Sequence, residues 1–493
     1  MMTTPPDTWP ADFVRRMRNW LGDEADAFFA ALARRDIGLR LNPVRGPLDA
    51  LKARIPWETQ PVPWCPEGVW LPPQIEPQIE PRIEPRIEPR IEPRIEPRIE
   101  PRIEREEARA GAHLYHTLGV YYIQDPSAMA AAVLLDPRPG EWVLDLAAAP
   151  GGKTTHIAAR MRGEGVLVAN ELVRRRASVL AMNIERMGVT NALILNETPE
   201  RLAERWAGLF DAVLVDAPCS GEGTFSRDSQ AIRDWSLDTV LGNSRRQKTI
   251  LDQTAPLVRR GGRLLYGTCT FAPEENEAVI ASFLVGHPDF EIVTLPQVPG
   301  LQPGRPEWVG APDDLRRAGR FWPHTGPGHG HFYALLRRAG EPGNDLPERW
   351  TGNTVPGRVW NLYLKSVGEA LAGAPPEQGL MLTKADDLYV TPMDPKLWEG
   401  LHVLRPGWWV ASLRHNKVWP DHALALALRP EEARAVVDLT PDDPRLTTYL
   451  RGGFWPDEGA GEYVLITVEG FPLGWAKRGE GRLRSRYPVH LRG

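Results

Sequence analysis

The feature that most constrains the fold is a regular alternation, between residues 142 and 266, of short apolar runs with segments long enough for a helix. Runs of this length are typical of buried strands, and strands that alternate with helices form a parallel sheet through crossover connections. We therefore predict an α/β fold with a doubly wound, Rossmann-like sheet. The expected strands lie at 142–146, 166–169, 192–195, 212–215 and 264–266, with a late edge strand at 331–336.

The 493 residues exceed what one ordinary core holds, so several domains are expected. Residues 13–34 have the apolar spacing of a helix, and the pattern beyond residue 340 shifts to short strand-like pieces such as 407–412 and 463–468. The predicted division is an N-terminal helical, RNA-binding segment over 1–72, a repeat insert over 73–107, the α/β domain over 108–340 and a β-rich C-terminal region over 345–493.

A tetrapeptide repeat, Ile-Glu-Pro-Arg, fills residues 75–104, with Gln78 in place of the first Arg. Proline at every fourth position removes backbone donors and clashes with the preceding turn, so neither a helix nor a sheet is expected. The glutamates and arginines cancel in charge. We expect an extended, disordered insert and assign it no chemistry.

Apolar residues make up 42% and charged residues 25% of the chain, as in a soluble globular protein. The sequence has neither an apolar run of about 18 residues nor an apolar stretch near its start, so we expect a cytoplasmic protein without a membrane span. The three cysteines Cys65, Cys219 and Cys269 are odd in number and widely spaced. This spacing fits neither a disulfide framework nor a zinc site, and no metal is expected.

The sequence VLDLAAAPGGKTT, residues 143–155, reads as a buried strand, a loop of small residues and the start of a helix. Open α/β sheets bind ligands at the carboxyl ends of their strands. The ending Gly-Lys-Thr also occurs in phosphate-binding loops, but that motif needs a glycine where this chain has Ala147. The next strand ends at Glu171, with Arg176 five residues later. An acid at this position is suited to holding ribose hydroxyls.

Two cysteines follow neighbouring predicted strands. Cys219 lies in DAPCSGEG, residues 216–223, and Cys269 lies in YGTCTF, residues 266–271. A free cysteine is most often a small buried apolar residue, but a thiol at the ligand-binding edge of a sheet is placed for covalent catalysis. A thiolate that adds to C6 of cytosine makes C5 nucleophilic, and a carboxyl group such as that of Asp216 stabilises the charge that builds at N3. From the residues alone either cysteine can be the nucleophile.

These motifs, with DLAAAPGGKT before them and PEENE (273–277) after them, resemble the RNA cytosine-C5 methyltransferases of the RsmB/Nop2/Sun family. Within that family the bacterial RsmF-type 16S rRNA methyltransferases are the most similar. The resemblance spans nearly the whole chain outside the repeat. It also includes GLRLNPVR (38–45), YYIQDPSAM (121–129), RFWPH (320–324) and GFPLGWAKR (470–478).

The resemblance implies roles for individual residues. Cys269 is the implied nucleophile, Cys219 assists release of the product, and Asp216 contacts the cytosine beside the cofactor. The implied cofactor is S-adenosylmethionine, whose ribose is held by Glu171 with support from Arg176. Its methionine part is implied to lie in the loop Ala147, Ala148, Ala149, Pro150, Gly151, Gly152 and Lys153.

One motif departs from the family. Many relatives carry Asp-Gly-Arg after the third strand, where the aspartate meets the adenine side of the cofactor. This chain has Asn196-Glu197-Thr198 instead, and Glu197 is expected to substitute.

The resemblance also implies an RNA partner, although the net charge of -5 does not by itself indicate one. A base inside a duplex must be flipped out to react, and the flanking domains are expected to provide compensating contacts. A PUA-like module is implied near the C-terminus, where a basic tail and the aromatic residues Trp475 and Tyr487 suit phosphates and stacked bases. The implied substrate is the decoding region of 16S rRNA in the small ribosomal subunit, modified by a monomer. The alternatives are a tRNA cytosine-C5 methyltransferase and a non-catalytic RNA-binding assembly factor, which would gain nothing from keeping both cysteines.

Overall fold

The computed structural model describes residues 8–72, 110–341, 343 and 347–492. The Ile-Glu-Pro-Arg repeat at 75–104 lies outside the described residues. Within the described part of the chain, no helix is both long and apolar enough to cross a membrane.

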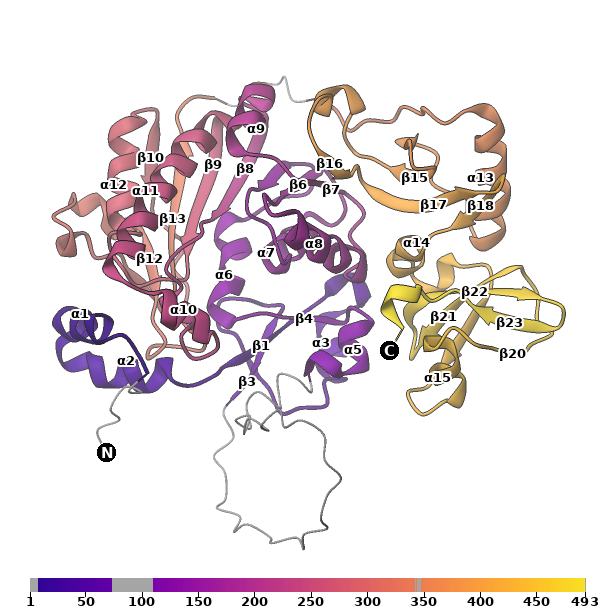
Figure 1. Ribbon diagram of the computed structural model, residues 1–493, viewed down its shortest axis with the longest axis horizontal. Coiled ribbons are helices and arrows are strands. Elements are labelled where there is room, and N and C mark those ends of the chain that lie inside the picture. The colour runs from indigo at the N-terminus through magenta and orange to yellow at the C-terminus, as the bar shows by residue number, and fades with distance from the viewer. Residues whose placement is uncertain (1–7, 73–109, 342, 344–346, 493) are drawn as a thin grey trace, which may run out of the picture.

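A ten-stranded sheet forms the centre of the molecule (Figure 1). Its middle strands run parallel in the order β9-β8-β5-β6-β7, which confirms the predicted doubly wound sheet. Each predicted strand is present, and β8 and β9 extend beyond their apolar runs. The bounds are β5 Trp142–Asp145, β6 Val166–Asn170, β7 Ala192–Leu195, β8 Phe210–Asp216 and β9 Val258–Thr268.

Helices cover both faces of this sheet because its buried strands present apolar side chains alternately to either side. Val143 and Leu167 pack with one group of helices, and Leu144 and Val168 pack with the other. The first group is α6 Pro126–Leu135, α7 Gly152–Met161 and α8 Arg174–Arg186. The second is α9 Pro199–Trp206, α11 Leu237–Thr254 and α12 Glu277–Gly286.

The prediction of an edge strand at 331–336 is wrong. β13, His331–Arg338, pairs antiparallel with β9 on one side and with β12, Gly319–Phe321, and β10, Phe290–Val293, on the other. β11, Leu301–Pro303, continues the sheet beyond β12. The chain between β9 and β13 supplies these short strands, so β13 is flanked on both sides.

The N-terminal part contains two helices where the apolar spacing predicted one: α1 Ala11–Leu21 and α2 Ala25–Leu32. Gly22 ends α1 with a φ of 54°, which glycine adopts without strain. A small sheet follows, in the order β2-β3-β1-β4, with the short helix α3 Leu48–Lys52 after β1 and α5 Leu114–Thr117 before β4. Its strands are β1 Ile37–Leu41, β2 Gln60–Pro61, β3 Gly68–Leu71 and β4 Tyr121–Ile123.

The C-terminal region is β-rich, as predicted, and contains two sheets. The first consists of β14 Leu380–Leu382, β15 Asp387–Val390, β17 Trp408–Arg414 and β18 Lys417–Pro420. The second consists of β19 Val436–Leu439, β20 Phe454–Pro456, β21 Tyr463–Val468, β22 Phe471–Gly479 and β23 Arg482–Ser485. The helices of this region are α13 Gly357–Ala370, α14 His422–Ala427 and α15 Pro444–Leu450.

A strand pairing and a shared apolar core are among the contacts that join the C-terminal region to the rest of the chain. β16, Val403–Arg405, pairs antiparallel with β7 at the end of the central sheet. One apolar cluster includes Leu39 and Val69 of the N-terminal sheet together with Val464 and Leu473 of the second C-terminal sheet. The two ends of the described chain therefore share a core.

Candidate active site

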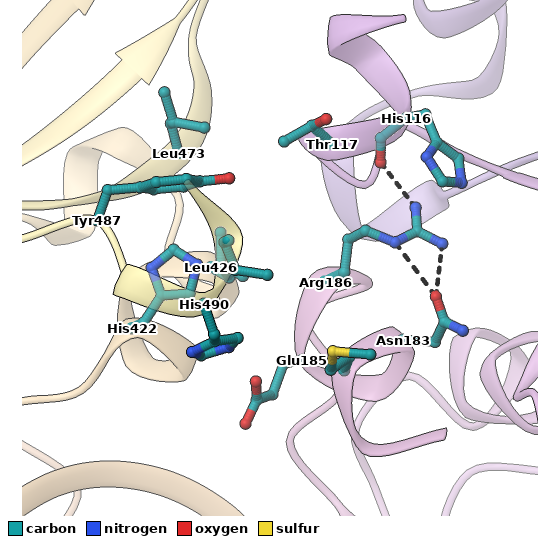
Figure 2. A pocket seen from close by; sticks show the side chains of 12 residues that line it. His116, Thr117, Asn183, Glu185, Arg186, His422, Leu426, Leu473, Tyr487 and His490 are labelled. Carbon is teal, nitrogen blue, oxygen red and sulfur yellow. Dashed lines mark hydrogen bonds between the residues drawn. The ribbon is translucent and has the colours of Figure 1, made fainter. Parts of the chain in front are cut away.

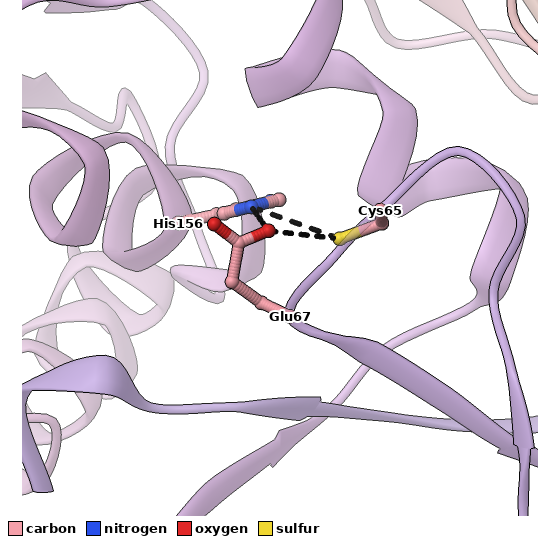
Figure 3. Close-up of side chains that lie close together, drawn as sticks. All are labelled: Cys65, Glu67 and His156. Carbon is pink, nitrogen blue, oxygen red and sulfur yellow. Dashed lines mark hydrogen bonds and ion pairs between the residues drawn. The ribbon is translucent and has the colours of Figure 1, made fainter. Parts of the chain in front are cut away.

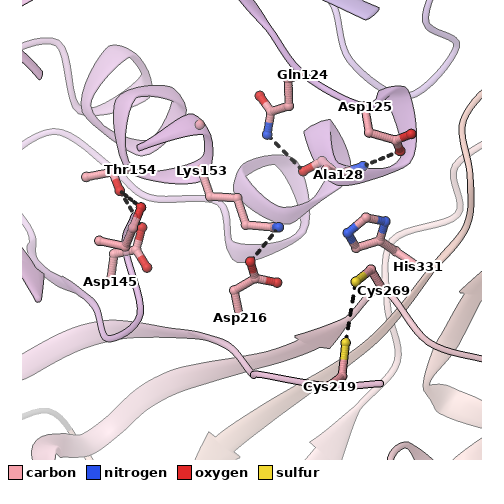
Figure 4. A network of polar contacts seen from close by, with 12 residues as sticks. Gln124, Asp125, Ala128, Asp145, Lys153, Thr154, Asp216, Cys219, Cys269 and His331 are labelled. Atoms are coloured by element: carbon pink, nitrogen blue, oxygen red, sulfur yellow. Dashed lines mark hydrogen bonds and ion pairs between the residues drawn. The ribbon is translucent and has the colours of Figure 1, made fainter. Parts of the chain in front are cut away.

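Cys219 and Cys269 lie side by side, with their sulfur atoms 3.4 Å apart (Figure 4). β8 and β9 are parallel neighbours, with Asp216 opposite Gly267, so both strands end at the same edge of the sheet. Cys269 follows β9 directly, and Cys219 lies three residues beyond β8. Both side chains are only partly buried. The hydrogen bond with Cys269, and then burial, raise the pKa of Cys219 well above its ordinary value, so its thiol stays protonated near neutral pH.

A buried hydrogen-bond network fixes the two cysteine loops relative to each other. Glu275 accepts hydrogen bonds from Ser220 N at 2.9 Å, from Ser220 Oγ and from Gln247 Nε2 at 3.0 Å. Ser220 Oγ also lies 2.8 Å from Thr270 Oγ1. Burial raises the pKa of Glu275 to about 7. The PEENE motif contains this residue, but the sequence alone does not show that its carboxylate turns back to the Pro-Cys loop.

Close backbone packing explains why residue 223 of the DAPCSGEG motif is a glycine. A Cβ atom at this position would lie 2.8 Å from the carbonyl oxygen of Cys269 and 3.0 Å from that of His329. Real Cβ atoms essentially never come so close to backbone oxygens. The glycine therefore lets the loop after β8 pass close to the end of β9 and to β13.

Lys153 and Asp216 form an ion pair beside the cysteines, with 2.7 Å between Lys153 Nζ and Asp216 Oδ2. Burial lowers the pKa of Lys153, but the Asp216 carboxylate more than offsets this effect, so the pKa is raised overall. Lys153 therefore stays charged and stabilises negative charge in the space between Asp216 and Cys269.

The loop of small residues turns tightly between β5 and α7. Gly151 has a φ of 111°, and a Cβ atom there would meet Leu180 at 3.2 Å and Asn183 at 3.4 Å. Ala148 N donates to Asn170 O at 2.8 Å, which ties the loop to the end of β6. Arg176 donates to Ala149 O at 2.8 Å. These contacts bring the loop Ala147–Lys153 to the same edge as Glu171 and Asp216.

Two carboxylate oxygens at this edge are buried and accept no hydrogen bond among the described residues: Asp145 Oδ1 and Glu171 Oε2. Arg176 lies 3.3 Å from Glu171 Oε2, and Val173 N donates to the other oxygen at 2.9 Å. Burial raises the pKa of Asp145 to about 7, and Thr154 Oγ1 donates to its other oxygen at 2.7 Å. Unsatisfied buried acceptors are rare in proteins, so both point to a ligand that carries donors. Asp145 was not among the predicted site residues, although it ends its strand.

Arg40 is a second residue that the sequence analysis missed. It extends from β1 and donates to the Gly152 carbonyl, to Gln124 Oε1 and, at 2.6 Å, to Thr155 Oγ1. Burial lowers its pKa to about 10. The N-terminal sheet thereby holds the first turn of α7, directly after the loop of small residues. Arg40 belongs to the family-like motif GLRLNPVR, but nothing in the sequence shows that its side chain contacts residue 152.

The Glu197 carboxylate has partners within the protein. It accepts a hydrogen bond from His402 N at 2.7 Å and lies 3.4 Å from Arg201 Nε. The contact with His402 ties the loop after β7 to the segment that leads into β16. That Glu197 replaces the family's adenine-side aspartate stays a prediction.

Cys65, Glu67 and His156 come together although the cysteine spacing predicted no zinc site (Figure 3). The Cys65 sulfur lies 3.4 Å from Glu67 Oε2 and 3.9 Å from His156 Nε2, which is 3.6 Å from the same carboxylate. The donor set suits zinc, but an imidazole that binds a metal normally donates its other N–H, and His156 Nδ1 is buried without a partner among the described residues. Burial raises the pKa of Cys65 to about 12, and Arg160 lies 3.6 Å from Glu67. We interpret the cluster as a hydrogen-bonded contact between the N-terminal sheet and α7.

The three histidines near β13 have separate partners. His324 contacts Glu24 at 3.0 Å, His329 Nδ1 contacts Asp125 at 2.5 Å, and His331 Nδ1 contacts Ser127 Oγ at 2.8 Å.

The aromatic residues expected to stack on RNA are buried. Trp475 is 2% exposed and donates its indole N–H to Asp421 O at 2.8 Å, and Tyr487 is 5% exposed. Every residue from Phe471 to Ala476 is buried, because this part of β22 is covered on both faces. The tail does expose cations next to other aromatic rings. Arg482 and Arg484 flank Phe454, and Arg486 lies over Trp419 at 4.1 Å.

A cavity of about 310 Å³ lies between α8 and the C-terminal region (Figure 2). Arg186 borders it and donates to His116 O at 2.7 Å and to Asn183 Oδ1 at 2.9 Å. His422, Tyr487 and His490 face it from the C-terminal side. No predicted site residue lines this cavity, which is separate from the cysteine site.

Comparison with known families assigns each part of the chain. The family model "16S rRNA methyltransferase RsmB/F" matches residues 132–337, and "N-terminal domain of 16S rRNA methyltransferase RsmF" matches residues 9–82. "RsmF rRNA methyltransferase first C-terminal domain" matches residues 367–428, and "Methyltransferase RsmF PUA domain" matches residues 436–493.

Two relatives named "Ribosomal RNA small subunit methyltransferase F", from Shigella boydii serotype 4 and Escherichia coli strain SE11, are each 30% identical to this chain. Each alignment covers 98% of this chain and 96% of the relative. A crystal structure described as a methyltransferase homologue from Pyrococcus horikoshii is 27% identical, with a TM-score of 0.53, and the match covers 68% of this chain and 100% of that one. This protein belongs to the RsmF-type family of 16S rRNA methyltransferases.

Proposed function

We propose that this protein transfers a methyl group from S-adenosylmethionine to C5 of a cytosine in 16S rRNA, through a covalent adduct between Cys269 and C6 of the base. The observation that carries the proposal is the placement of two thiols 3.4 Å apart at the end of adjacent parallel strands, next to the ion pair of Lys153 and Asp216. A structural cysteine pair has no need of a charged lysine beside it. A thiol nucleophile does, because the thiolate is the reactive form.

The residues at the strand ends fit S-adenosylmethionine. The free oxygen of Glu171 suits a ribose hydroxyl, and the free oxygen of Asp145 suits the cationic amino group of the methionine part. The loop Ala147–Lys153 lies between them and has no large side chain before Lys153. When bound, S-adenosylmethionine supplies an electrophilic methyl group.

The protein side chains divide the remaining work. Lys153 supplies a positive charge beside Cys269, whose thiolate adds to C6 and makes C5 nucleophilic. Asp216, held by Lys153, contacts the N3 side of the ring, where the positive charge of Lys153 offsets the negative charge that develops. Cys219 keeps its proton and can donate a hydrogen bond to the departing Cys269 sulfur when the product leaves. Cys219 thus assists product release, and Cys269 is the nucleophile that attacks C6.

For the substrate, we propose the decoding region of 16S rRNA in the small ribosomal subunit, modified by a cytoplasmic monomer. The match to the PUA domain and the exposed arginines of β23 support an RNA partner. The predicted division at 1–72, 108–340 and 345–493 assigns RNA contacts to the flanking parts and the chemistry to the middle. A tRNA substrate with the same chemistry is the alternative, and an unchanged 16S methylation pattern would favour it.

Three single-cysteine variants test the mechanism with purified protein, 16S rRNA and radiolabelled S-adenosylmethionine. Cys269→Ala should lose methyl transfer and still bind the cofactor. Cys219→Ala should accumulate a protein–RNA adduct that survives a denaturing gel. Cys65→Ala is the matched control, because this cysteine lies in the separate cluster with Glu67 and His156, and it should keep near-native activity. Full activity of Cys269→Ala would refute the assignment, and fast turnover of Cys219→Ala without an adduct would remove Cys219 from release.

A further inference from the structure

His331 and Cys269 lie near each other where β13 begins and β9 ends. The pairing of β13 with β9 ends with Phe332 opposite Thr268, and His331 and Cys269 are the next residues along the two chains. Figure 4 shows the imidazole of His331 next to the Cys269 thiol, on the side toward Asp125. The proposed mechanism gives this histidine no role.

A hydrogen-bond chain fixes which ring nitrogen of His331 carries the proton. Ser127 Oγ donates to Asp125 Oδ1, because an ionised carboxylate can only accept. His329 and Arg227 keep Asp125 ionised: burial raises its pKa, but the contact with His329 lowers it well below the ordinary value. The single hydroxyl proton of Ser127 is used in the hydrogen bond to Asp125. His331 Nδ1 must therefore be the donor in its 2.8 Å contact with Ser127 Oγ. This leaves Nε2 as an unprotonated acceptor.

Among the described residues, the His331 side chain forms a hydrogen bond through Nδ1 and none through Nε2, and its imidazole lies beside the Cys269 thiol (Figure 4). Burial, and then the charge of Lys153, lower the pKa of His331 to about 4, so the ring is neutral near pH 7. The charged and titratable groups around the ring are Lys153, Asp216, Cys269, Asp125, Arg227 and the stacked Tyr333.

We propose that His331 is the catalytic base that removes the C5 proton after methyl transfer; this inference rests on the proposed function. In the adduct, C6 is bonded to the Cys269 sulfur, and C5 carries both the new methyl group and a hydrogen. His331 Nε2 takes that hydrogen as a proton, and the C5–H electron pair forms the C5=C6 double bond. The C6–S bond breaks, and its electron pair returns to Cys269 as a thiolate. Asp125, through Ser127, then stabilises the imidazolium.

The order of the strands places the base on the required side. Across the sheet edge the order is the loop after β5, Asp216 on β8, Cys269 after β9 and His331 on β13. A methyl group that arrives from the cofactor side leaves the C5 hydrogen pointing toward the nucleophile side, where His331 lies. Cys219 is a poorer acceptor because its thiol is already protonated. The two residues are complementary: Cys219 donates a hydrogen bond to the leaving thiolate, and His331 receives the proton from carbon.

The test separates methyl transfer from proton release. RNA with tritium at C5 of cytosine and S-adenosylmethionine with a ¹⁴C-labelled methyl group are used in single turnovers with excess enzyme. For the native protein, tritium release should keep pace with methyl incorporation. For His331→Gln, methyl incorporation should stay within about twofold of native, while tritium release slows by about 10²-fold and methylated adduct accumulates. His324→Gln, a second histidine of the same segment that contacts Glu24 instead, is the matched control and should behave as native.

Ser127→Ala keeps the imidazole but removes the hydroxyl that links it to Asp125, so it should slow tritium release by about tenfold. This variant also tests the inference if His331→Gln fails to fold. If tritium release keeps pace with methyl incorporation in both variants, the inference is overturned. If the native protein releases no tritium at all, the proposed function itself fails, so the two failures are distinguishable.

Discussion

At the scale of single residues, three acidic side chains end adjacent parallel strands but differ in what they can bind. Asp216 forms an ion pair with Lys153. Glu171 accepts a hydrogen bond from Val173 N through one oxygen and lies near Arg176 with the other. Asp145 has a buried oxygen that accepts no hydrogen bond among the described residues. A paired carboxylate orients a substrate, whereas a free one needs a ligand with donors. The difference follows from which neighbours the fold brings near each acid, not from the acid itself.

Asp145 should make folding stability depend on pH. Burial raises its pKa from 3.8 to about 7 in the folded protein, so the folded state binds the proton more tightly than the unfolded chain. Its contribution is fully present below pH 3.8 and is lost as the pH rises to about 7. Between these limits the free energy of unfolding of the native protein should fall, relative to Asp145→Asn, by up to about 4 kcal/mol. Chemical denaturation from pH 4 to 8 measures this difference, and a constant difference would contradict it.

The sequence predicts the cysteine pair and the acids at the strand ends because each directly follows an apolar run, and parallel strands share one edge. It does not predict Asp125, Ser127 and His331 as a unit, because their contact spans about 200 residues and depends on β13 lying beside β9. The expected stacking role of Trp475 was wrong for a similar reason. Nothing local shows that both faces of β22 are covered.

At the scale of elements, β1 supports the cofactor loop. Arg40 projects from this strand to the first turn of α7, where backbone, amide and hydroxyl oxygens accept its hydrogen bonds. The strand thereby couples the N-terminal sheet to the position of Gly152 and Lys153. This element is the physical reason for an arginine in GLRLNPVR.

Replacing Arg40 should loosen that support. Arg40→Met keeps the length of the side chain but leaves the Gly152 carbonyl and the side chains of Gln124 and Thr155 without their donor. We expect a loss of about 2–4 kcal/mol in unfolding free energy and weaker binding of S-adenosylmethionine. Thermal unfolding and calorimetric titration measure both quantities. Arg54→Met, at an exposed arginine that donates only to Glu469 O, is the control, and equal effects of the two changes would argue against a special role for β1.

β23 should contribute to RNA affinity. Arg482, Arg484 and Arg486 are exposed and lie over aromatic rings. Changing all three to Gln should weaken RNA binding and reduce the slope of log K against log salt by up to about 2, because fewer counterions are released. The same change at the exposed residues Arg138, Arg316 and Arg429, which are scattered over the surface, is the charge-matched control. Equal losses in both triple variants would show a general charge effect instead of a site on β23.

At the scale of the whole molecule, the C-terminal region is built into the rest of the chain. β16 extends the central sheet at β7, and the second C-terminal sheet shares its apolar core with the N-terminal sheet. The three residues of β16 carry no pattern that predicts a strand in a distant sheet. The β-rich character of the C-terminal region could therefore be predicted from the sequence, but the way this region packs against the rest of the chain could not. One consequence is that RNA contacts at the C-terminus are held at a set position relative to the cysteines.

The repeat should be dispensable for this architecture. Its composition predicts no packed element. Replacing the repeat by a short Gly/Ser linker should shift the melting temperature by no more than about 2 °C, a change close to what a single neutral surface substitution gives. A scanning calorimetry trace measures this shift. A loss of 8 °C or more would show that the repeat contributes to the fold.

The most direct test of the central claim is bisulfite sequencing of 16S rRNA from three strains: one with the native gene, one without it, and one with Cys269→Ala at native expression. The account predicts a protected cytosine near the decoding site in the first strain and its loss in the other two. Protection that persists in the Cys269→Ala strain would contradict the covalent mechanism, and identical 16S profiles in all three strains would contradict the substrate.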